Sequence, residues 1–143
     1  AMLSHSRFAA LAACSVFAAC TYAGDATSPH LTAAPAAPYA KVSSLVKLPD
    51  FIPGLGTLYV DPSTLPAGPF LGYDRDGRLS ATIYMVPIKA LQNGESWDAL
   101  KTGDARVDSV DIYYNAGHPG VEEPHVHVVL FHDAAARARL AGK

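Results

Sequence analysis

The sequence predicts an α+β fold that is mainly antiparallel β, either a small barrel or a curved sheet, with one central and one C-terminal helix. Short runs rich in β-branched and aromatic residues are separated by Gly, Pro and Asp turns, as is typical of antiparallel sheets. Only two segments have the composition of a helix. Both cysteines of the 143-residue chain lie near its start, at Cys14 and Cys20. The folded part therefore has no disulfide to support it.

The first residues are typical of a secretory signal peptide, which we assign to residues 1–23. A polar stretch ending at Arg7 precedes an apolar run from Phe8 to Cys20. This run is shorter than the about 20 residues that a membrane-spanning helix needs. A basic start, an apolar centre and small residues at the end are the features of an export signal.

Cys20 gives this leader a more specific interpretation. It follows Phe17-Ala18-Ala19, and this resembles the lipobox of bacterial lipoproteins, in which the cysteine carries the lipid. The resemblance implies an outer-membrane lipoprotein that touches the membrane only through its lipid anchor. Cleavage after Ala23 is the alternative and would give a soluble periplasmic protein. A Cys14–Cys20 disulfide is a third alternative and requires an uncleaved leader.

The remaining chain divides into a tether and a domain. Residues 24–40 consist largely of Ala, Pro, Thr and Ser, and such a composition buries too little apolar surface to fold. We therefore expect a disordered tether, followed by a single globular β-rich domain over residues 41–143. The formal net charge is −2 and the chain has no basic run. Binding of nucleic acid, which needs a clustered positive face, is not expected.

Five runs are predicted to be strands. The segment 74–77 between the second and third runs, Asp-Arg-Asp-Gly, is predicted to be a hairpin turn because Gly tolerates the positive φ of such turns. In the fourth run Val110, Ile112 and Tyr114 carry most of the apolar weight, and we expect them to face the core. The five runs are residues 57–60, 69–73, 78–86, 106–114 and 125–131.

Two helices are predicted. Residues 88–100 are predicted to form the central helix, interrupted at Asn93-Gly94, in which Trp97 and Leu100 are expected to pack onto the sheet. Asp133 is a good N-cap residue for a short C-terminal helix over residues 134–140.

Histidines are concentrated near the C-terminus, where four of the six are found. His125 and His127 are two apart on a predicted strand and therefore project from the same face, while Val126 and Val128 are expected to face the core. His118 lies in the loop that leads into this strand, so its imidazole can fold over the same face. Three convergent imidazoles with an open fourth position are the arrangement of catalytic zinc sites. The cluster predicts a transition-metal site, with zinc or copper as the first choices and nickel or iron as alternatives.

Two further residues are candidate ligands. Glu123 joins the strand pair if the strand begins early enough, either as a ligand or as the partner of a ligand. His132 comes five residues after His127, so strict alternation places it on the other face unless the strand bulges or ends. The alternative for the whole cluster is ordinary surface polarity on a half-solvated sheet.

Two resemblances concern this stretch. Pro124-His125-Val126-His127 resembles the first metal motif of cupins, in which a Glu follows the His-x-His pair; this chain has His132 at the corresponding place. The cupin resemblance implies a metal-binding barrel. Residues 114–131 are similar to small exported bacterial domains of unknown function, in which a Gly-His-Pro loop precedes a strand that opens with Pro-His. That similarity implies no established activity.

The sequence therefore predicts an exported domain that binds a transition metal through its histidines. It leaves open a small metalloenzyme that acts on a small-molecule substrate, with Glu122 or Glu123 as the base. The alternative is a lipid-tethered interaction module, or a homo-oligomeric assembly module without catalysis, whose tyrosine-rich strands pair with copies of the chain or with a partner. The tyrosines concerned are Tyr59, Tyr73, Tyr84, Tyr113 and Tyr114.

Overall fold

The computed structural model describes residues 34–103 and 106–142. The predicted signal peptide, the lipobox-like Cys20 and the first part of the predicted tether lie outside these residues. Within the described part, no helix has the length and apolar character needed to cross a membrane.

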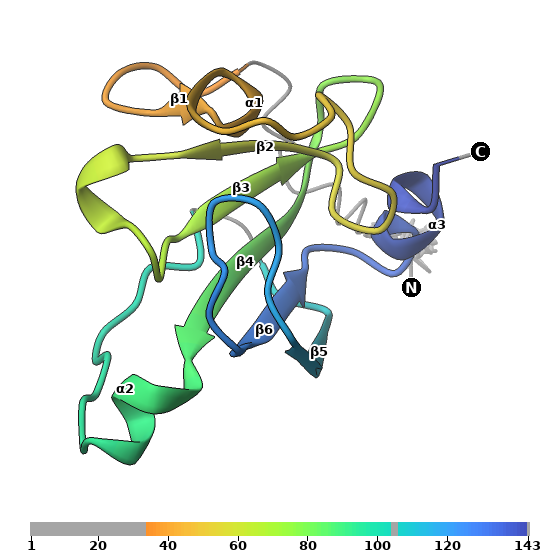
Figure 1. Ribbon diagram of the computed structural model, residues 1–143. Coiled ribbons are helices and arrows are strands. Elements are labelled where there is room, and N and C mark those ends of the chain that lie inside the picture. Colours follow the sequence, from red (N-terminus) through yellow and green to blue (C-terminus); the bar gives the residue numbers. More distant parts are fainter. Residues whose placement is uncertain (1–33, 104–105, 143) are drawn as a thin grey trace, which may run out of the picture.

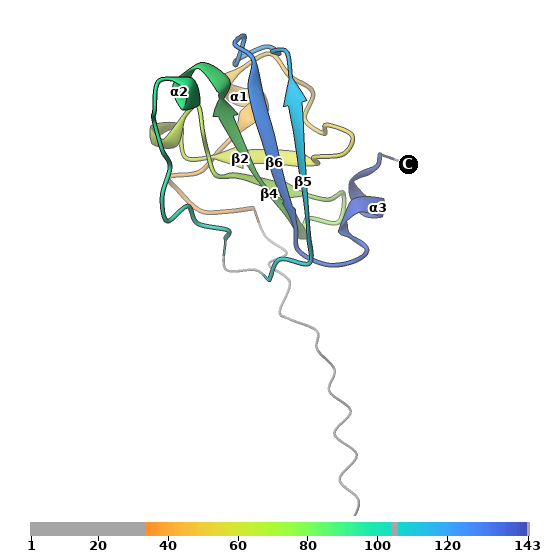
Figure 2. The ribbon, with the colours of Figure 1, turned by 90° about the horizontal axis from the view of Figure 1, so that it is seen from below.

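Six strands form one antiparallel sheet in the order β1-β2-β3-β4-β6-β5 (Figure 1). The strands are β1 (Ala40–Lys41), β2 (Thr57–Val60), β3 (Phe70–Tyr73), β4 (Leu79–Pro87), β5 (Ser109–Asn115) and β6 (His125–Phe131). The sheet is strongly twisted, so that β2 runs across the direction of β4, β6 and β5 (Figure 2). In the described chain β1 and β5 are sheet edges. The α+β prediction is confirmed. Of its two alternatives, the described residues form a curved sheet, and a closed barrel is not shown.

Three short helices accompany the sheet: α1 (Val42–Leu45), α2 (Ile88–Gln92) and α3 (Ala136–Leu140). The predicted central helix is therefore too long, since α2 ends at Gln92. Gly94 has φ +83°, a left-handed conformation that favours Gly and commonly ends helices. The expected packing of Leu100 is also wrong, because this side chain is exposed, and Trp97 is half-buried on an irregular segment.

The C-terminal helix is shorter than predicted as well. It begins at Ala136, and Asp133 caps the turn before it by accepting a hydrogen bond from the backbone N–H of Ala135. Two predicted strands, 57–60 and 125–131, match β2 and β6 residue for residue, and the other three are confirmed with shifted ends.

The main core lies on one face of β4 and β6. Ala81, Ile83 and Met85 alternate inward along β4, and Val129 and Phe131 do so along β6. The remaining buried members of this core come from β2, β3 and the helices, namely Val42, Leu58, Val60, Phe70, Ala136 and Leu140.

The predicted orientation of β5 is wrong. Val110, Ile112 and Tyr114 are 47%, 70% and 63% exposed, so they lie on the outer face of the sheet. Antiparallel partners share a face, and Tyr113 is the residue paired with His127. On the inner face of β5, Tyr113 and Asn115 pair with His127 and His125, whereas Ser109 and Asp111 pair with the core residues Phe131 and Val129.

The same correction applies to β6. Val126 and Val128 were expected to face the core, but they are half-buried on the outer face, and His125 and His127 occupy the buried face. The apolar residues of β6 occur at both alternating positions, so its sequence does not indicate which face is inside.

The chain before β2 contributes to the fold from Tyr39 onward. Tyr39 packs against the small apolar cluster of Leu71, Tyr73 and Leu79, and Ala40 pairs with Val60. The last residues of the predicted tether therefore belong to the packed domain.

A buried ionic network joins α3 to the β3–β4 turn. The Asp74 carboxylate accepts hydrogen bonds from Ser80 Oγ at 3.0 Å and from Arg139 Nε at 2.7 Å. Its other oxygen accepts from the backbone N–H groups of Asp76 and Arg78. Arg139 also binds Asp133. This network fixes the end of the chain against the turn that was predicted from the Asp-Arg-Asp-Gly sequence.

Candidate metal centre

The strand pair forms the fixed half of the histidine cluster. His125 and His127 alternate inward from β6 and are 0% and 3% exposed. Their Nε2 atoms lie 2.9 Å apart, with the rings nearly parallel. Because β6 lies between β4 and β5, both histidines have a partner residue on each side: Pro87 and Asn115 for His125, Met85 and Tyr113 for His127.

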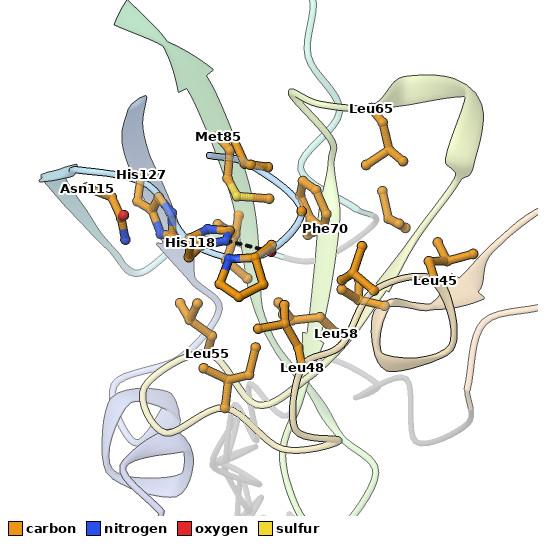
Figure 3. Close-up of a pocket in the computed structure, with 18 of the residues that line it drawn as sticks. Leu45, Leu48, Leu55, Leu58, Leu65, Phe70, Met85, Asn115, His118 and His127 are labelled. Carbon is orange, nitrogen blue, oxygen red and sulfur yellow. Dashed lines mark hydrogen bonds between the residues drawn. The ribbon is translucent and has the colours of Figure 1, made fainter. Parts of the chain in front are cut away.

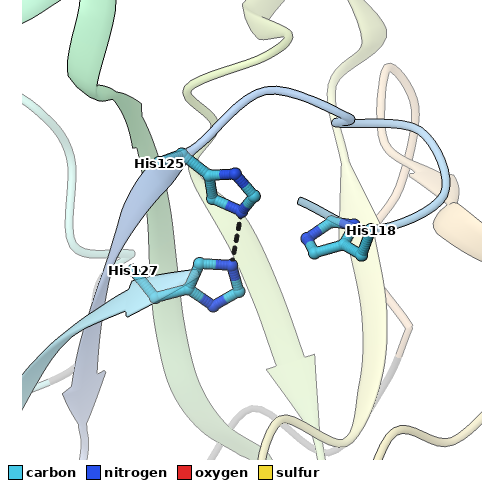
Figure 4. Close-up of side chains that lie close together, drawn as sticks. All are labelled: His118, His125 and His127. Atoms are coloured by element: carbon cyan, nitrogen blue, oxygen red, sulfur yellow. Dashed lines mark hydrogen bonds between the residues drawn. The ribbon is translucent and has the colours of Figure 1, made fainter. Parts of the chain in front are cut away.

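His118 reaches the pair from a tight turn. The backbone groups of His118 and Val121 bond to each other in both directions, at 2.9 Å, and Pro119-Gly120 occupies the corner. Gly120 has φ +90°, as the third residue of a type II turn requires, and Pro favours the second position. The His118 ring stands edge-on to His125 and His127, with centroids 4.9 and 5.6 Å away (Figure 4).

The three imidazoles have the spacing of a metal site. One ring nitrogen from each of His118, His125 and His127 lies within 4.8 Å of the other two, so this group could hold a metal ion. No acidic residue of the described chain belongs to the group.

Hydrogen bonds to the outer ring nitrogens orient two of the rings. His125 Nδ1 lies 2.6 Å from the backbone oxygen of Glu123, and His118 Nδ1 lies 3.1 Å from that of Pro119. A carbonyl oxygen can only accept, so each Nδ1 carries a proton, and in the neutral ring the lone pair is on Nε2. This arrangement, with Nδ1–H on a carbonyl and Nε2 free, is typical of metal-binding histidines.

His127 has a different outer partner, because its Nδ1 lies 3.0 Å from the hydroxyl of Tyr113. A tyrosine hydroxyl can donate or accept, so it suits either tautomer of the ring. Burial lowers the pKa of His127 to about 4, and the neighbouring His125 and His118 act in the same direction. His127 is therefore neutral at pH 7, as a metal ligand must be.

The two other candidate ligands lie elsewhere. His132 is buried on the opposite side of the sheet, where Nε2 bonds to Thr82 Oγ1 at 2.9 Å and Nδ1 to the Arg106 carbonyl at 2.8 Å. Its position agrees with strict alternation from His127. Glu123 has an exposed side chain and serves the site through its backbone carbonyl, on His125.

Sequence reasoning missed the role of Tyr113 at the site. Its contact with His127 depends on the register of β5 against β6, which pairs these two residues. In the sequence, this tyrosine stands out only as part of an aromatic-rich strand. Pairing the two predicted strands as an antiparallel hairpin and testing each register could have found it.

An apolar cavity of about 330 Å³ lies beside the cluster. His118, His127, Tyr113 and Asn115 form its polar side, and leucine, valine, isoleucine, phenylalanine and methionine side chains form most of the remainder. Figure 3 shows His127 and Asn115 at one side of this space and Leu45 and Leu65 at the other. A bound metal would therefore face a space that a small molecule can enter.

Fold and site together define a small open antiparallel sheet with a three-histidine cluster at the edge of its core. No protein-family model and no curated protein matches the chain. The crystal structure of the hypothetical protein TTHB210 from Thermus thermophilus is similar at a TM-score of 0.58 and 46% sequence identity. The match covers 67% of this chain and 90% of that one. The chain belongs to the same family as that protein, whose description names no activity.

Proposed function

We propose that this protein is an exported domain that binds a transition metal, zinc or copper, through Nε2 of His118, His125 and His127. The observation that carries the proposal is the convergence of three imidazoles in a buried place, two of them with their outer nitrogen on a backbone carbonyl. Export is supported by the leader sequence, which lies outside the described residues.

The metal-free contacts indicate how the site would accept an ion. With Nδ1 protonated on His125, the 2.9 Å contact between the two Nε2 atoms requires that His127 donates. Tyr113 then donates to His127 Nδ1. Metal binding at Nε2 requires the ring proton of His127 to be on Nδ1 instead, where it can donate a hydrogen bond to the Tyr113 hydroxyl oxygen. Tetrahedral zinc, with Zn–N bonds of about 2.0–2.1 Å, places two ligand nitrogens about 3.4 Å apart, so the rings need to separate by about 0.5 Å.

A bound ion would act as a Lewis acid and would lower the pKa of a coordinated water. The protein's contribution is a neutral ligand set, a hydrogen-bonded partner for each outer nitrogen, and an apolar cavity on the open side. Glu122 and Glu123 have exposed side chains, so the proposal gives them no role as a base.

The test is calorimetric titration of untagged protein with Zn(II) and Cu(II). We expect one ion per chain in the wild type and a loss of at least about 100-fold in affinity for His125→Ala and His127→Ala, since each removes a ligand. His30→Ala removes a histidine of the predicted tether and is the matched control. Retention of wild-type affinity in both strand variants would refute the site.

A second candidate function is self-assembly, and the outer face of β5 favours it. Val110, Ile112 and Tyr114 are exposed there on an edge strand, and exposed edges readily pair with another chain. A second copy, related by a twofold axis, would continue the sheet along β5. Sedimentation velocity tests it: assembly through β5 predicts a dimer or larger species that Ile112→Lys dissociates, whereas a monomeric wild type contradicts it.

A further inference from the structure

The cavity beside the histidines has two chemically different sides. Apart from Tyr113, Asn115, His118 and His127, its lining is apolar, and no Lys, Arg, Asp or Glu of the described chain contributes to it. Leu45 and Leu65, at the side away from the histidines, are 44% and 47% exposed and mark an apolar entrance. A molecule that fills this space must therefore be apolar along most of its length and polar only at the histidine end.

The size of the space limits the molecule. An apolar cavity of about 150 Å³ holds one benzene molecule. The cavity here, at about 330 Å³, is roughly twice as large and accommodates on the order of ten carbon atoms. This volume lies at the lower end of the range found for small-molecule sites.

The charge of the proposed metal site determines which polar group the bound molecule should carry. All three ligands are imidazoles, so a divalent ion bound by His118, His125 and His127 would keep its full charge next to an apolar cavity. Among the described residues, no cationic side chain lines the cavity to attract an anion in the absence of metal. An anionic oxygen ligand from the bound molecule would offset the charge of the ion, and a carboxylate, which is a ligand that zinc accepts, can fill one open coordination position.

We infer that the cavity binds a medium-chain carboxylate of about eight to ten carbons, with its chain among the leucines and its carboxylate on the metal. This inference rests on the proposed metal site. It gives that site a substrate or ligand class: medium-chain fatty acids or molecules of the same shape and charge.

The experiment measures octanoate, octan-1-ol and acetate binding by calorimetry, with and without one equivalent of Zn(II). We expect octanoate affinity to rise at least about tenfold with zinc, and zinc affinity to rise by the same factor with octanoate, because coupling between two ligands is reciprocal. Octan-1-ol should bind with or without metal, and acetate should bind far more weakly than octanoate.

Two cavity-filling variants, Leu48→Phe and Leu65→Trp, narrow the space from different walls. Each should reduce octanoate affinity at least about tenfold, since added ring atoms occupy the volume of the chain, and each should leave zinc affinity unchanged. If zinc binds and octanoate binds no better than acetate, the cavity inference is overturned while the metal site stands. If zinc does not bind, the metal proposal fails, and octan-1-ol alone then reports whether the cavity takes an apolar chain.

Discussion

The protein buries two polar clusters in the same small sheet, one around Asp74 and one formed by the histidines. They differ in how the protein itself satisfies their polar atoms. Asp74 has a side chain that is 1% exposed, and its carboxylate accepts four hydrogen bonds from the protein itself. Burial alone would raise the pKa of Asp74, but the bonds from the Arg78 backbone, Arg139, Ser80 and the Asp76 backbone together hold it below its usual value.

The histidine cluster has no comparable set of charged and backbone partners at its inward-facing nitrogens. His125 and His127 are as deeply buried as Asp74, yet the nitrogens that face inward meet only other imidazoles of the described chain. The comparison indicates that the Asp74 cluster is satisfied within the chain, whereas the histidine cluster could hold a metal ion.

The largest effect on stability is expected from removing a partner in the Asp74 cluster. Arg139→Met leaves the Asp74 carboxylate buried without its cationic partner, and we expect a loss of about 3–5 kcal/mol in the free energy of unfolding, measured by urea denaturation. Arg137→Met is the matched control, because the Arg137–Asp111 pair is exposed on the surface and should be worth about 1 kcal/mol or less. Equal losses of unfolding free energy in the two variants would show that burial of Asp74 does not make its ion pair more important for stability than the exposed pair.

A smaller effect is expected at the outer partner of the open cluster. Tyr113→Phe removes the hydroxyl that holds His127 Nδ1, and we expect zinc affinity to fall about tenfold, as is usual for such partners of metal ligands. The adjacent Tyr114→Phe loses a hydroxyl from a side chain that is 63% exposed and should not change zinc affinity. A Tyr113→Phe protein with wild-type affinity would show that the Tyr113 hydroxyl does not support His127 as a ligand.

The smallest effect concerns the pH dependence of stability without metal. The pKa of His127 is about 4 in the fold, against 6.5 for a free imidazole. As pH falls through this window, the unfolded chain takes up a proton that the folded chain excludes, so stability must fall. Between pH 7 and 5.5 we expect the urea-unfolding free energy to fall by about 1 kcal/mol from this group.

The variant His127→Leu removes this titration and should flatten the pH dependence over the same window. Burial also lowers the pKa of His132, so part of the slope should remain in the variant. A slope identical to wild type would mean that His127 is not the neutral, buried group described above.

Much of the sheet was predictable because turn residues bracket its strands. The Asp-Arg-Asp-Gly turn and the Gly- and Pro-rich segment before His125 gave the limits of β3, β4 and β6 closely. The orientation of β5 was not predictable, because in this edge strand the apolar residues lie on the exposed face of the sheet and the polar residues on the inner face. Its outer face is apolar at a sheet edge, and only Tyr113 and Asn115 of its inner face pair with the histidines.

Within the site, alternation along β6 correctly predicted that His125 and His127 share a face, and the loop position of His118 correctly indicated that its ring can fold over that face. What sequence reasoning could not supply was the pairing of Tyr113 with His127, which depends on register. It also missed the cavity, whose apolar walls come largely from α1, β2, β3, β4 and the segments between them.

The position of β6 inside the sheet has a consequence for timing. The strand is bonded to β4 along one side and β5 along the other, so its amides should be among the slowest to exchange with deuterium, opening only with the domain. His118 is held by the two backbone bonds of one turn, which can open far more often. If the proposed ion binds, it should meet the strand pair first and gain the third nitrogen afterwards, and its residence time should depend on how often the turn at His118 opens.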